Sequence, residues 1–370
     1  MFRYYSPVDV RFGFGVRGQV LDAVAALGGR AFVVVDPMVA TSELFLKFAE
    51  GLKLASECIW ASVEPNPSVR TAQLIADFIK NTNASCVIAV GGGSVLDAAK
   101  AAALSAGTGI LVEQFHQGIE PVKGNSIPLI AIPTTAGTGS EVTMVSVLTD
   151  VERGIKAPIG GPALFPRIAL VDPEWTLSVP PSVTAATGMD ALSHALEGYW
   201  SVHHQPFCDL FAQKSAELVF RNLENAFSDP NDREAREALS LASLLGGLAF
   251  AQPKTAAVHA CSFVLTQRYG LSHGVACALT LDAFLVFNAE HDPMRLDAFA
   301  RAIGLGCSRA LATKIRELKS AVGLPCSLKE ANIPESEIDL LVRESFHPNM
   351  LNNPREVKPE LLRSLYLNLS

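Results

Sequence analysis

The feature that most constrains this chain of 370 residues is a change in hydrophobic pattern at Pro180-Pro181. Before the two prolines, short apolar runs at Ala31–Val35, Cys86–Val90 and Pro128–Ile132 alternate with segments of helical spacing, such as Val16–Leu27. Strands that alternate with helices form mostly parallel sheets with both faces covered. We therefore expect an α/β domain over residues 1–181.

After the prolines, strand-like runs disappear and helical patterns dominate. We expect an all-α domain over residues 182–370. Its predicted helices are Ala185–Tyr199, Pro206–Asn222, Arg233–Ala251, Thr255–Gln267, Gly274–Phe287, Pro293–Ile303, Ser308–Val322 and Ser336–Ser345.

The composition is typical of a well-packed protein, since 49% of the residues are hydrophobic and only 18% are charged. The net charge of −7, without a basic cluster, argues against nucleic-acid or membrane-surface partners. Seven scattered cysteines without a CxxC pair fit a reducing compartment. The N-terminal residues lack a signal-peptide pattern and no apolar run is long enough to span a membrane, so the expected location is the cytoplasm.

Two loops that follow predicted strands have the composition of a nucleotide site. Gly91-Gly-Gly-Ser94 follows Cys86–Val90 and opens a helix, where a phosphate can approach the backbone and its free N–H groups. A tight turn would use the same glycines, and the pattern is not the spaced GxGxxG motif. The loop after Pro128–Ile132 adds hydroxyls from Thr134, Thr135, Thr138 and Ser140. Because ligands bind at the carboxyl ends of strands in open α/β sheets, the two loops together favour a dinucleotide.

Asp36 directly follows the predicted strand Ala31–Val35. An acidic group at this point accepts hydrogen bonds from the adenosine ribose and repels a 2′-phosphate, which favours NAD over NADP. An ordinary turn aspartate before Pro37 explains the residue equally well.

One carboxylate and three imidazoles in the helical half suggest a metal site. Asp190 and His194 are four residues apart and share one helix face, while His259 and His273 follow in a second helix–turn segment. This set suits Fe²⁺ or Zn²⁺. A hydrogen-bonded helical histidine would explain the first pair alone, but the second pair and the upstream nucleotide loops favour the metal. The histidines interpreted as ordinary surface or core residues are His116, His203, His204, His291 and His347.

Cys261 and Cys277 flank the candidate ligands His259 and His273. They could act as soft metal ligands, but burial as small apolar side chains is the more common role of free cysteine. The combination of a metal and a dinucleotide predicts hydride transfer. Such transfer to an aldehyde builds negative charge on oxygen, which a Lewis-acid metal stabilises.

Four ordered motifs resemble the iron-containing (group III) alcohol dehydrogenases over nearly the whole chain. They are Gly91-Gly-Gly-Ser-Val-Leu-Asp97-Ala-Ala-Lys100, Pro133-Thr-Thr-Ala-Gly-Thr-Gly-Ser-Glu-Val-Thr143, Gly188-Met-Asp190-Ala-Leu-Ser-His194-Ala-Leu-Glu197 and His273-Gly. The resemblance implies a Rossmann-like N-terminal domain and a helical C-terminal domain, together a dehydroquinate synthase-like superfold. It implies that Fe²⁺ or Zn²⁺ is held by Asp190, His194, His259 and His273.

The resemblance also implies cofactor contacts, with Lys156 near the nicotinamide ribose. From its sequence context alone, Lys156 would be a solvated strand lysine. The implied contacts are Asp36, Asn66, Gly92, Gly93, Ser94, Asp97, Thr134, Thr135, Thr138 and Lys156.

One position departs from the family pattern. Many relatives have a proton-relaying histidine four residues after the third ligand, where this chain has Phe263. Proton exchange would then use bound water, ribose hydroxyls or the substrate, and Phe263 would shape the pocket wall.

Two arginines are candidates for binding the substrate. Arg268, five residues before His273, could pair with a phosphonate, sulfonate or carboxylate on a small aldehyde, and Arg355 is a weaker candidate. Loop arginines are more often solvated. The segment Cys261–Thr280 resembles the family branch that contains phosphonoacetaldehyde reductases and hydroxyethylphosphonate dehydrogenases.

The predicted fold and ligand set are compatible with three functions. The favoured one is a metal-dependent NAD(H) alcohol dehydrogenase or aldehyde reductase. A dehydroquinate-synthase-like lyase would need several lysines and arginines near the ligands, and a catalytically silent nucleotide-binding protein would not need the ligand set. Family members are often dimers through N-terminal strands, and the β-like opening Val8–Phe14 is compatible with a homodimer.

Overall fold

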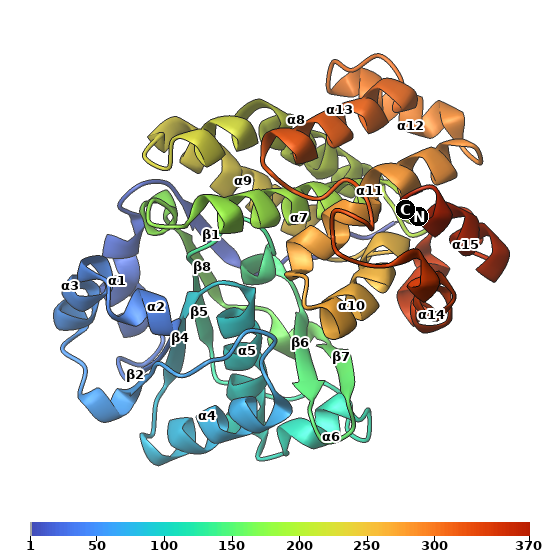
Figure 1. Ribbon diagram of the computed structural model, residues 1–370. Coiled ribbons are helices and arrows are strands. Elements are labelled where there is room, and N and C mark those ends of the chain that lie inside the picture. The colour runs from blue at the N-terminus through green and yellow to red at the C-terminus, as the bar shows by residue number, and fades with distance from the viewer. Residues whose placement is uncertain (1) are drawn as a thin grey trace. The chain divides into compact units, whose positions relative to one another are not determined.

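The computed structural model describes residues 2–370, and the chain divides into two compact units (Figure 1). The α/β unit comprises Tyr5–Thr135 and Gly139–Leu177. The helical unit comprises Ser178–Ser370, the short segment Ala136–Thr138 and the N-terminal residues up to Tyr4. Compactness alone does not show where an independently folding domain ends, so the predicted boundary after residue 181 stays a prediction.

The α/β unit is built on a six-stranded sheet in the order β1-β8-β5-β4-β2-β3, and every strand pair in it is parallel. The mostly parallel sheet predicted from the alternating pattern is confirmed. Its strands are β1 Asp9–Phe12, β2 Ala31–Val35, β3 Ile59–Trp60, β4 Cys86–Gly91, β5 Leu129–Pro133 and β8 Ile168–Val171.

Helices cover both faces of this sheet (Figure 1). Alternating side chains of β2 pack in two different hydrophobic cores, one on each face of the sheet. Val33 packs with residues of α1 and α3, whereas Val34 packs with residues of α4 and α5. Burial on both faces explains why the strands are continuous apolar runs. The helices are α1 Val20–Ala26, α2 Pro37–Ala40, α3 Glu43–Leu52, α4 Val69–Asn81, α5 Gly93–Thr108 and α6 Val112–His116.

A separate antiparallel pair, β6 Val145–Asp150 and β7 Ile155–Gly160, also belongs to this unit. Short 3₁₀ helices connect elements throughout the chain. They are η1 Val16–Gln19, η2 Ser56–Cys58, η3 Ser140–Val142, η4 Pro162–Leu164, η5 Pro173–Thr176, η6 Glu335–Glu337 and η7 Pro348–Asn352.

The helical unit contains no strand among its described residues, as the sequence predicts. Within residues 2–370, every helix is too short or too polar to cross a lipid bilayer. The helices are α7 Pro181–Trp200, α8 Pro206–Ser228, α9 Arg233–Phe250, α10 Ala257–Tyr269, α11 His273–Ala289, α12 Pro293–Ala302, α13 Ser308–Ala321, α14 Ile338–Glu344 and α15 Pro359–Leu367.

Helix α7 forms the centre of this unit and is buried from Gly188 to Trp200. Glycines allow its neighbours to approach closely. A Cβ atom on Gly188 would lie 2.4 Å from Leu223 of α8, and one on Gly274 of α11 would lie 2.0 Å from the carbonyl oxygen of Ala186. Side chains on α7 therefore point into a closely packed interior, where unpaired polar groups are costly.

Candidate functional site

The four predicted metal ligands lie together in the helical unit. Asp190 and His194 come from α7, His259 from α10, and His273 begins α11. The Oδ1 atom of Asp190 is 3.9 Å from Nε2 of His194, 3.6 Å from Nε2 of His259 and 3.7 Å from Nε2 of His273. One carboxylate oxygen thus faces three imidazole nitrogens at separations too long for ordinary hydrogen bonds.

The donor atoms of this cluster fit a cation. Asp190 Oδ1 is buried and has no hydrogen-bond partner among the described residues. Nδ1 of His194 lies 3.2 Å from the carbonyl oxygen of Gly137, and a carbonyl only accepts, so this nitrogen carries the proton. Nδ1 of His259 bonds to the carboxylate of Glu197 in the same way. If both rings are neutral, their Nε2 atoms carry lone pairs only 3.0 Å apart, and a bound cation would remove the repulsion between them.

Glu197 orients the third ligand. Its carboxylate is fully buried, accepts from the backbone N–H of Val258 at 2.7 Å, and also bonds the ring of His259. Such carboxylate–histidine pairs fix the tautomer of a metal ligand. Glu197 lies within one of the family-like motifs, but no role was predicted for it from the sequence. Its position, seven residues after Asp190, places both on one helix face and was the available signal.

The electrostatics of the cluster favour the ligand forms of two groups. Burial holds the pKa of His194 down to about 4, so the imidazole is neutral. Burial by itself would raise the pKa of Asp190, but the facing rings of His194 and His273 outweigh it and lower that pKa well below its usual range. A neutral imidazole and an ionised carboxylate are the forms that bind a divalent metal.

A fifth donor belongs to the same cluster. The Sγ atom of Cys277, one turn after His273 on α11, lies 3.9 Å from Nε2 of His273. The donor atoms of Asp190, His259, His273 and Cys277 all lie within 4.8 Å of one another. The sequence favoured simple burial for Cys277, but its thiol is both buried and directed at the candidate ligands.

In the α/β unit, the two glycine- and hydroxyl-rich loops lie side by side. They follow the adjacent strands β4 and β5, in which Gly91 pairs with Pro133. Gly92 precedes α5, and a Cβ atom on it would lie 3.1 Å from Oγ1 of Thr135. Thr135 thus lies close to the backbone of Gly92, and a phosphate could accept hydrogen bonds from the first N–H groups of α5, those of Gly93 and Ser94.

Three further predicted cofactor residues converge from separate segments. Asn66 has a left-handed backbone with φ 55°, and its N–H donates to Oγ of Ser94 at 3.3 Å. Nζ of Lys156, on β7, donates to Oδ1 of Asn66 at 2.7 Å. Lys156 is therefore held at the opening of α5, beside the proposed phosphate-binding backbone.

Asp97 and Thr134 are placed differently. Asp97 is an interior group: Ser140 Oγ donates to its carboxylate at 2.7 Å, and the backbone N–H of Val147 donates at 2.9 Å. Nζ of the buried Lys100 also donates to Ser140 Oγ, and burial lowers the pKa of Lys100 to about 8. This network braces the loop after β5, where Thr134 is buried, and a direct cofactor contact by Asp97 stays a prediction.

Thr138 belongs to the short segment Ala136–Thr138 of the helical unit, and its cofactor role also stays a prediction. Asp36 is the N-cap of α2, and its Oδ1 accepts from Met38 N at 2.9 Å and from Val39 N at 3.3 Å. The turn interpretation of Asp36 is thus observed, while ribose binding is a prediction for the same carboxylate.

The two predicted substrate-pocket residues have clear partners in the helical unit. Phe263 packs against the ring of His347, with the ring centroids 4.7 Å apart. The guanidinium of Arg268 forms two hydrogen bonds with the carboxylate of Glu344, so its fork is already occupied by an anion. Arg355 likewise bonds Glu290, at 2.6 Å. A substrate contact by either arginine stays a prediction.

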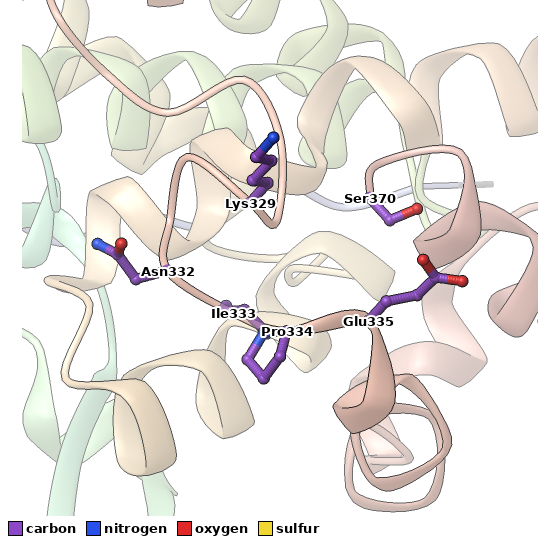
Figure 2. A pocket seen from close by; sticks show the side chains of 6 residues that line it. All are labelled: Lys329, Asn332, Ile333, Pro334, Glu335 and Ser370. Carbon is purple, nitrogen blue, oxygen red and sulfur yellow. The ribbon is translucent and has the colours of Figure 1, made fainter.

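A surface hollow of about 510 Å³ lies elsewhere in the helical unit (Figure 2). It contains none of the candidate ligands, and its side chains show no cluster of metal-binding groups. Its lining residues are Lys329, Asn332, Ile333, Pro334, Glu335 and Ser370.

The parallel α/β fold and the donor set fit a nucleotide- and metal-dependent oxidoreductase, and comparison with known proteins gives the family. The model of the family described as "Iron-containing alcohol dehydrogenase" matches residues 7–173. The model described as "Fe-containing alcohol dehydrogenase family, C-terminal" matches residues 184–369. The chain belongs to the iron-containing alcohol dehydrogenase family. The predicted superfold, enzyme class, NAD cofactor and divalent metal are confirmed.

Among curated relatives, the choline dehydrogenase of Bacillus subtilis (strain 168) is 33% identical over 97% of this chain and 93% of its own length. The NAD-dependent methanol dehydrogenase of Bacillus methanolicus is 31% identical over 96% of each protein. Among solved structures, sulfoacetaldehyde reductase from Bifidobacterium kashiwanohense in complex with NAD⁺ is 42% identical. The TM-score between the two structures is 0.95, and the match covers 100% of this chain and 98% of the reductase chain.

Proposed function

We propose that this dehydrogenase interconverts a short anionic aldehyde and its alcohol at a metal held by Asp190, His194, His259 and His273. The main support for the metal site is that Oδ1 of Asp190 is buried, has no hydrogen-bond partner among the described residues and faces three imidazole nitrogens. When bound, the divalent ion would stabilise negative charge on the substrate oxygen during hydride transfer with the nicotinamide.

The protein groups around these ligands have separate tasks. Gly137 and Glu197 hold the rings of His194 and His259 in the tautomer whose Nε2 can ligate. The ring of Phe250 stacks on His194, with the centroids 4.1 Å apart, and so excludes water from one side of the ligand. Preorganised ligands reduce the reorganisation needed when a cation binds.

For the cofactor, we assign the pyrophosphate to the N-terminus of α5 at Gly92, Gly93 and Ser94, where free N–H groups and the helix dipole favour an anion. The pair of Lys156 and Asn66 beside Ser94 supplies the ribose contacts. Asp36, at the end of β2, would accept hydrogen bonds from the adenosine ribose.

The substrate class is supported by the sulfoacetaldehyde reductase, which is 42% identical to this chain. Because Arg268 is bound to Glu344, we assign the anionic group to His347 instead. Nδ1 of His347 accepts a hydrogen bond from Asn349 N at 3.2 Å, so in the neutral ring Nε2 carries the proton and can donate. The ring lies against Phe263, one helical turn from the ligand His259.

The test compares sulfoacetaldehyde with neutral propanal in NADH-dependent reduction, using metal-loaded and chelator-stripped enzyme. We expect the anionic aldehyde to have a kcat/KM at least about tenfold higher, since a hydrogen bond to a charged group contributes roughly 1.5–3 kcal/mol. His347→Ala should remove that preference through KM, and His347→Gln, which retains an N–H donor, should restore part of it. Equal kcat/KM for the two aldehydes, or turnover without metal, would contradict the proposal.

A homodimer through β1 is a further part of this proposal. This strand lies at one edge of the sheet, where its outer backbone groups can pair with a second copy. Light scattering coupled to size exclusion should give twice the 39.4 kDa chain mass. A monomeric mass at micromolar concentration would exclude it.

A further inference from the structure

We infer that Cys277 is an additional ligand of the proposed metal centre and binds the ion as a thiolate. This inference rests on the proposed metal centre, but concerns a residue that the motif-based ligand set omits. The starting observation is that the donor atoms of Cys277, Asp190, His259 and His273 all lie within 4.8 Å of one another.

The separations match the edges of a coordination shell. Neighbouring ligands at about 2.0–2.3 Å from a five-coordinate ion lie roughly 2.8–4.0 Å from one another. Asp190 Oδ1 is 3.6 Å from His259 Nε2 and 3.7 Å from His273 Nε2, and Cys277 Sγ is 3.9 Å from His273 Nε2. The longest of these edges involves sulfur, which forms the longer metal bond.

The position of Cys277 follows from its helix. His273 and Cys277 are four residues apart on α11, so both side chains project from one face. The close approach of Gly274 to the backbone of Ala186 holds this end of α11 against α7, which carries Asp190. The thiol is therefore directed at the ligands by packing that a surface cysteine would lack.

Cys261 shows what a purely structural cysteine looks like in the same unit. It is also fully buried and also lies next to a ligand, two residues after His259. Its thiol, however, interacts with the hydroxyl groups of Ser345 and Tyr366, and it does not belong to the donor cluster. Two cysteines of equal burial thus have different surroundings, and only one faces the metal ligands.

A bound dication would favour the thiolate form of Cys277. Asp190 contributes one negative charge directly to the ion, and the buried carboxylate of Glu197 contributes another only through the ring of His259. A thiolate would place a second negative charge on the ion itself. On binding, the thiol of Cys277 would lose its proton to solvent as the sulfur–metal bond forms. The resulting mixed N, O and S shell favours zinc or cobalt over hard ions such as Mg²⁺.

The experiment uses the full-length protein stripped of metal and reloaded with Co²⁺ as a spectroscopic probe. Visible d–d bands report cobalt in the site, and a near-ultraviolet thiolate-to-cobalt charge-transfer band reports a sulfur ligand. We expect both signals in the wild type and in Cys261→Ala, and the d–d bands alone in Cys277→Ala and Cys277→Ser. Chelator competition should show metal binding weakened about tenfold or more in the two Cys277 variants.

Zinc-edge X-ray absorption of the wild type tests the same point without any variant, and should resolve one sulfur neighbour at about 2.3 Å. Cobalt d–d bands without a charge-transfer band, or a shell of nitrogen and oxygen alone, would overturn the role of Cys277 and leave the metal centre standing. Failure of the wild type to bind cobalt or zinc at all would overturn the metal centre itself, and the inference with it.

Discussion

The candidate ligand sites in the two units of this enzyme are built from different chemical groups. In the helical unit, the candidate metal site is built from side chains: Asp190, His194, His259 and His273 each offer one donor atom, and Cys277 lies among them. In the α/β unit, the candidate nucleotide site is built largely from backbone N–H groups at the start of α5 and from the absence of a side chain at Gly92.

This difference determines how each site tolerates substitution. A side-chain site loses a charged or coordinating atom when one residue changes, and the remaining donors are left buried and unpaired. A backbone site keeps its N–H groups through most substitutions and is sensitive mainly to added bulk. We therefore expect large effects in the helical unit and smaller ones, expressed as cofactor KM or preference, in the α/β unit.

The largest effect is expected for Asp190→Asn, which removes the anionic oxygen that faces all three imidazoles. Loss of the metal should lower kcat/KM by about 10³-fold, since Lewis-acid stabilisation contributes several kcal/mol. Metal content by mass spectrometry and initial rates of NADH oxidation measure the effect. The matched control is Asp209→Asn, whose carboxylate pairs with Arg295 at 2.9 Å in the same unit. A fully metallated, active Asp190→Asn would refute the side-chain description of this site.

Glu197→Gln should have the next largest effect. The amide cannot serve as the anionic partner of His259 Nδ1, so the ring tautomer and orientation are less well fixed. Metal affinity should fall roughly 10–100-fold, as is common for such outer partners. Competition with a metallochromic chelator provides the measurement. Glu217→Gln, on the surface of α8 beside Arg221, should bind metal like the wild type. An unchanged metal affinity in Glu197→Gln would show that the carboxylate contributes packing alone and does not orient His259.

Gly92→Ala tests the backbone description of the other unit. The new Cβ atom would lie 3.1 Å from Oγ1 of Thr135 and project beside the helix start. We expect KM for NADH to rise about tenfold, the equivalent of one weakened hydrogen bond to a charged group of about 1.5 kcal/mol, with metal content unchanged. Gly160→Ala is the control, because a Cβ atom there meets nothing within 4 Å. If both variants have the wild-type KM, the phosphate does not bind at this turn.

Asp36→Ser should give the smallest effect. Serine preserves the N-cap of α2, so stability should change little, but the negative charge disappears. The ratio of kcat/KM for NADH over NADPH should fall several-fold, because repulsion of the 2′-phosphate is relieved. Asp232→Ser changes an equivalent cap on α9 and should leave the ratio unaltered. A constant ratio in Asp36→Ser would assign this aspartate to capping alone.

The contrast between the units also explains which elements the sequence predicts well. Of the strands that are buried along their whole length, β2, β4 and β5 are continuous apolar runs and are predicted within one residue at each end, whereas the shorter β8 was not predicted. The short β3 and the half-buried β6 and β7 carry no such run and were not predicted. Helix α7 extends to Pro181, beyond the predicted start at Ala185, because proline is favoured in the first turn.

Among site residues, a shared helix face could be predicted from spacing in the sequence. The partner that a side chain meets from a distant segment could not. The four-residue spacing of Asp190 and His194 indicates a shared helix face, and the structure places both at one cluster. Arg268 has the right chemistry for an oxyanion, but Glu344, 76 residues later in the chain, already occupies its fork. Asp97 lies in a phosphate-loop motif, but its carboxylate accepts hydrogen bonds from interior groups of a later segment.

The sequence by itself determined the parallel α/β arrangement, the helical half and the candidate donor residues, because hydrophobic periodicity and residue chemistry are local properties. Only the tertiary structure decided which donors meet. It directed Cys277 and not Cys261 toward Asp190, buried Glu197 against His259, and set His347 against Phe263. These choices depend on close packing between helices that are far apart in the chain, at contacts such as Gly274 with Ala186, which no local pattern encodes.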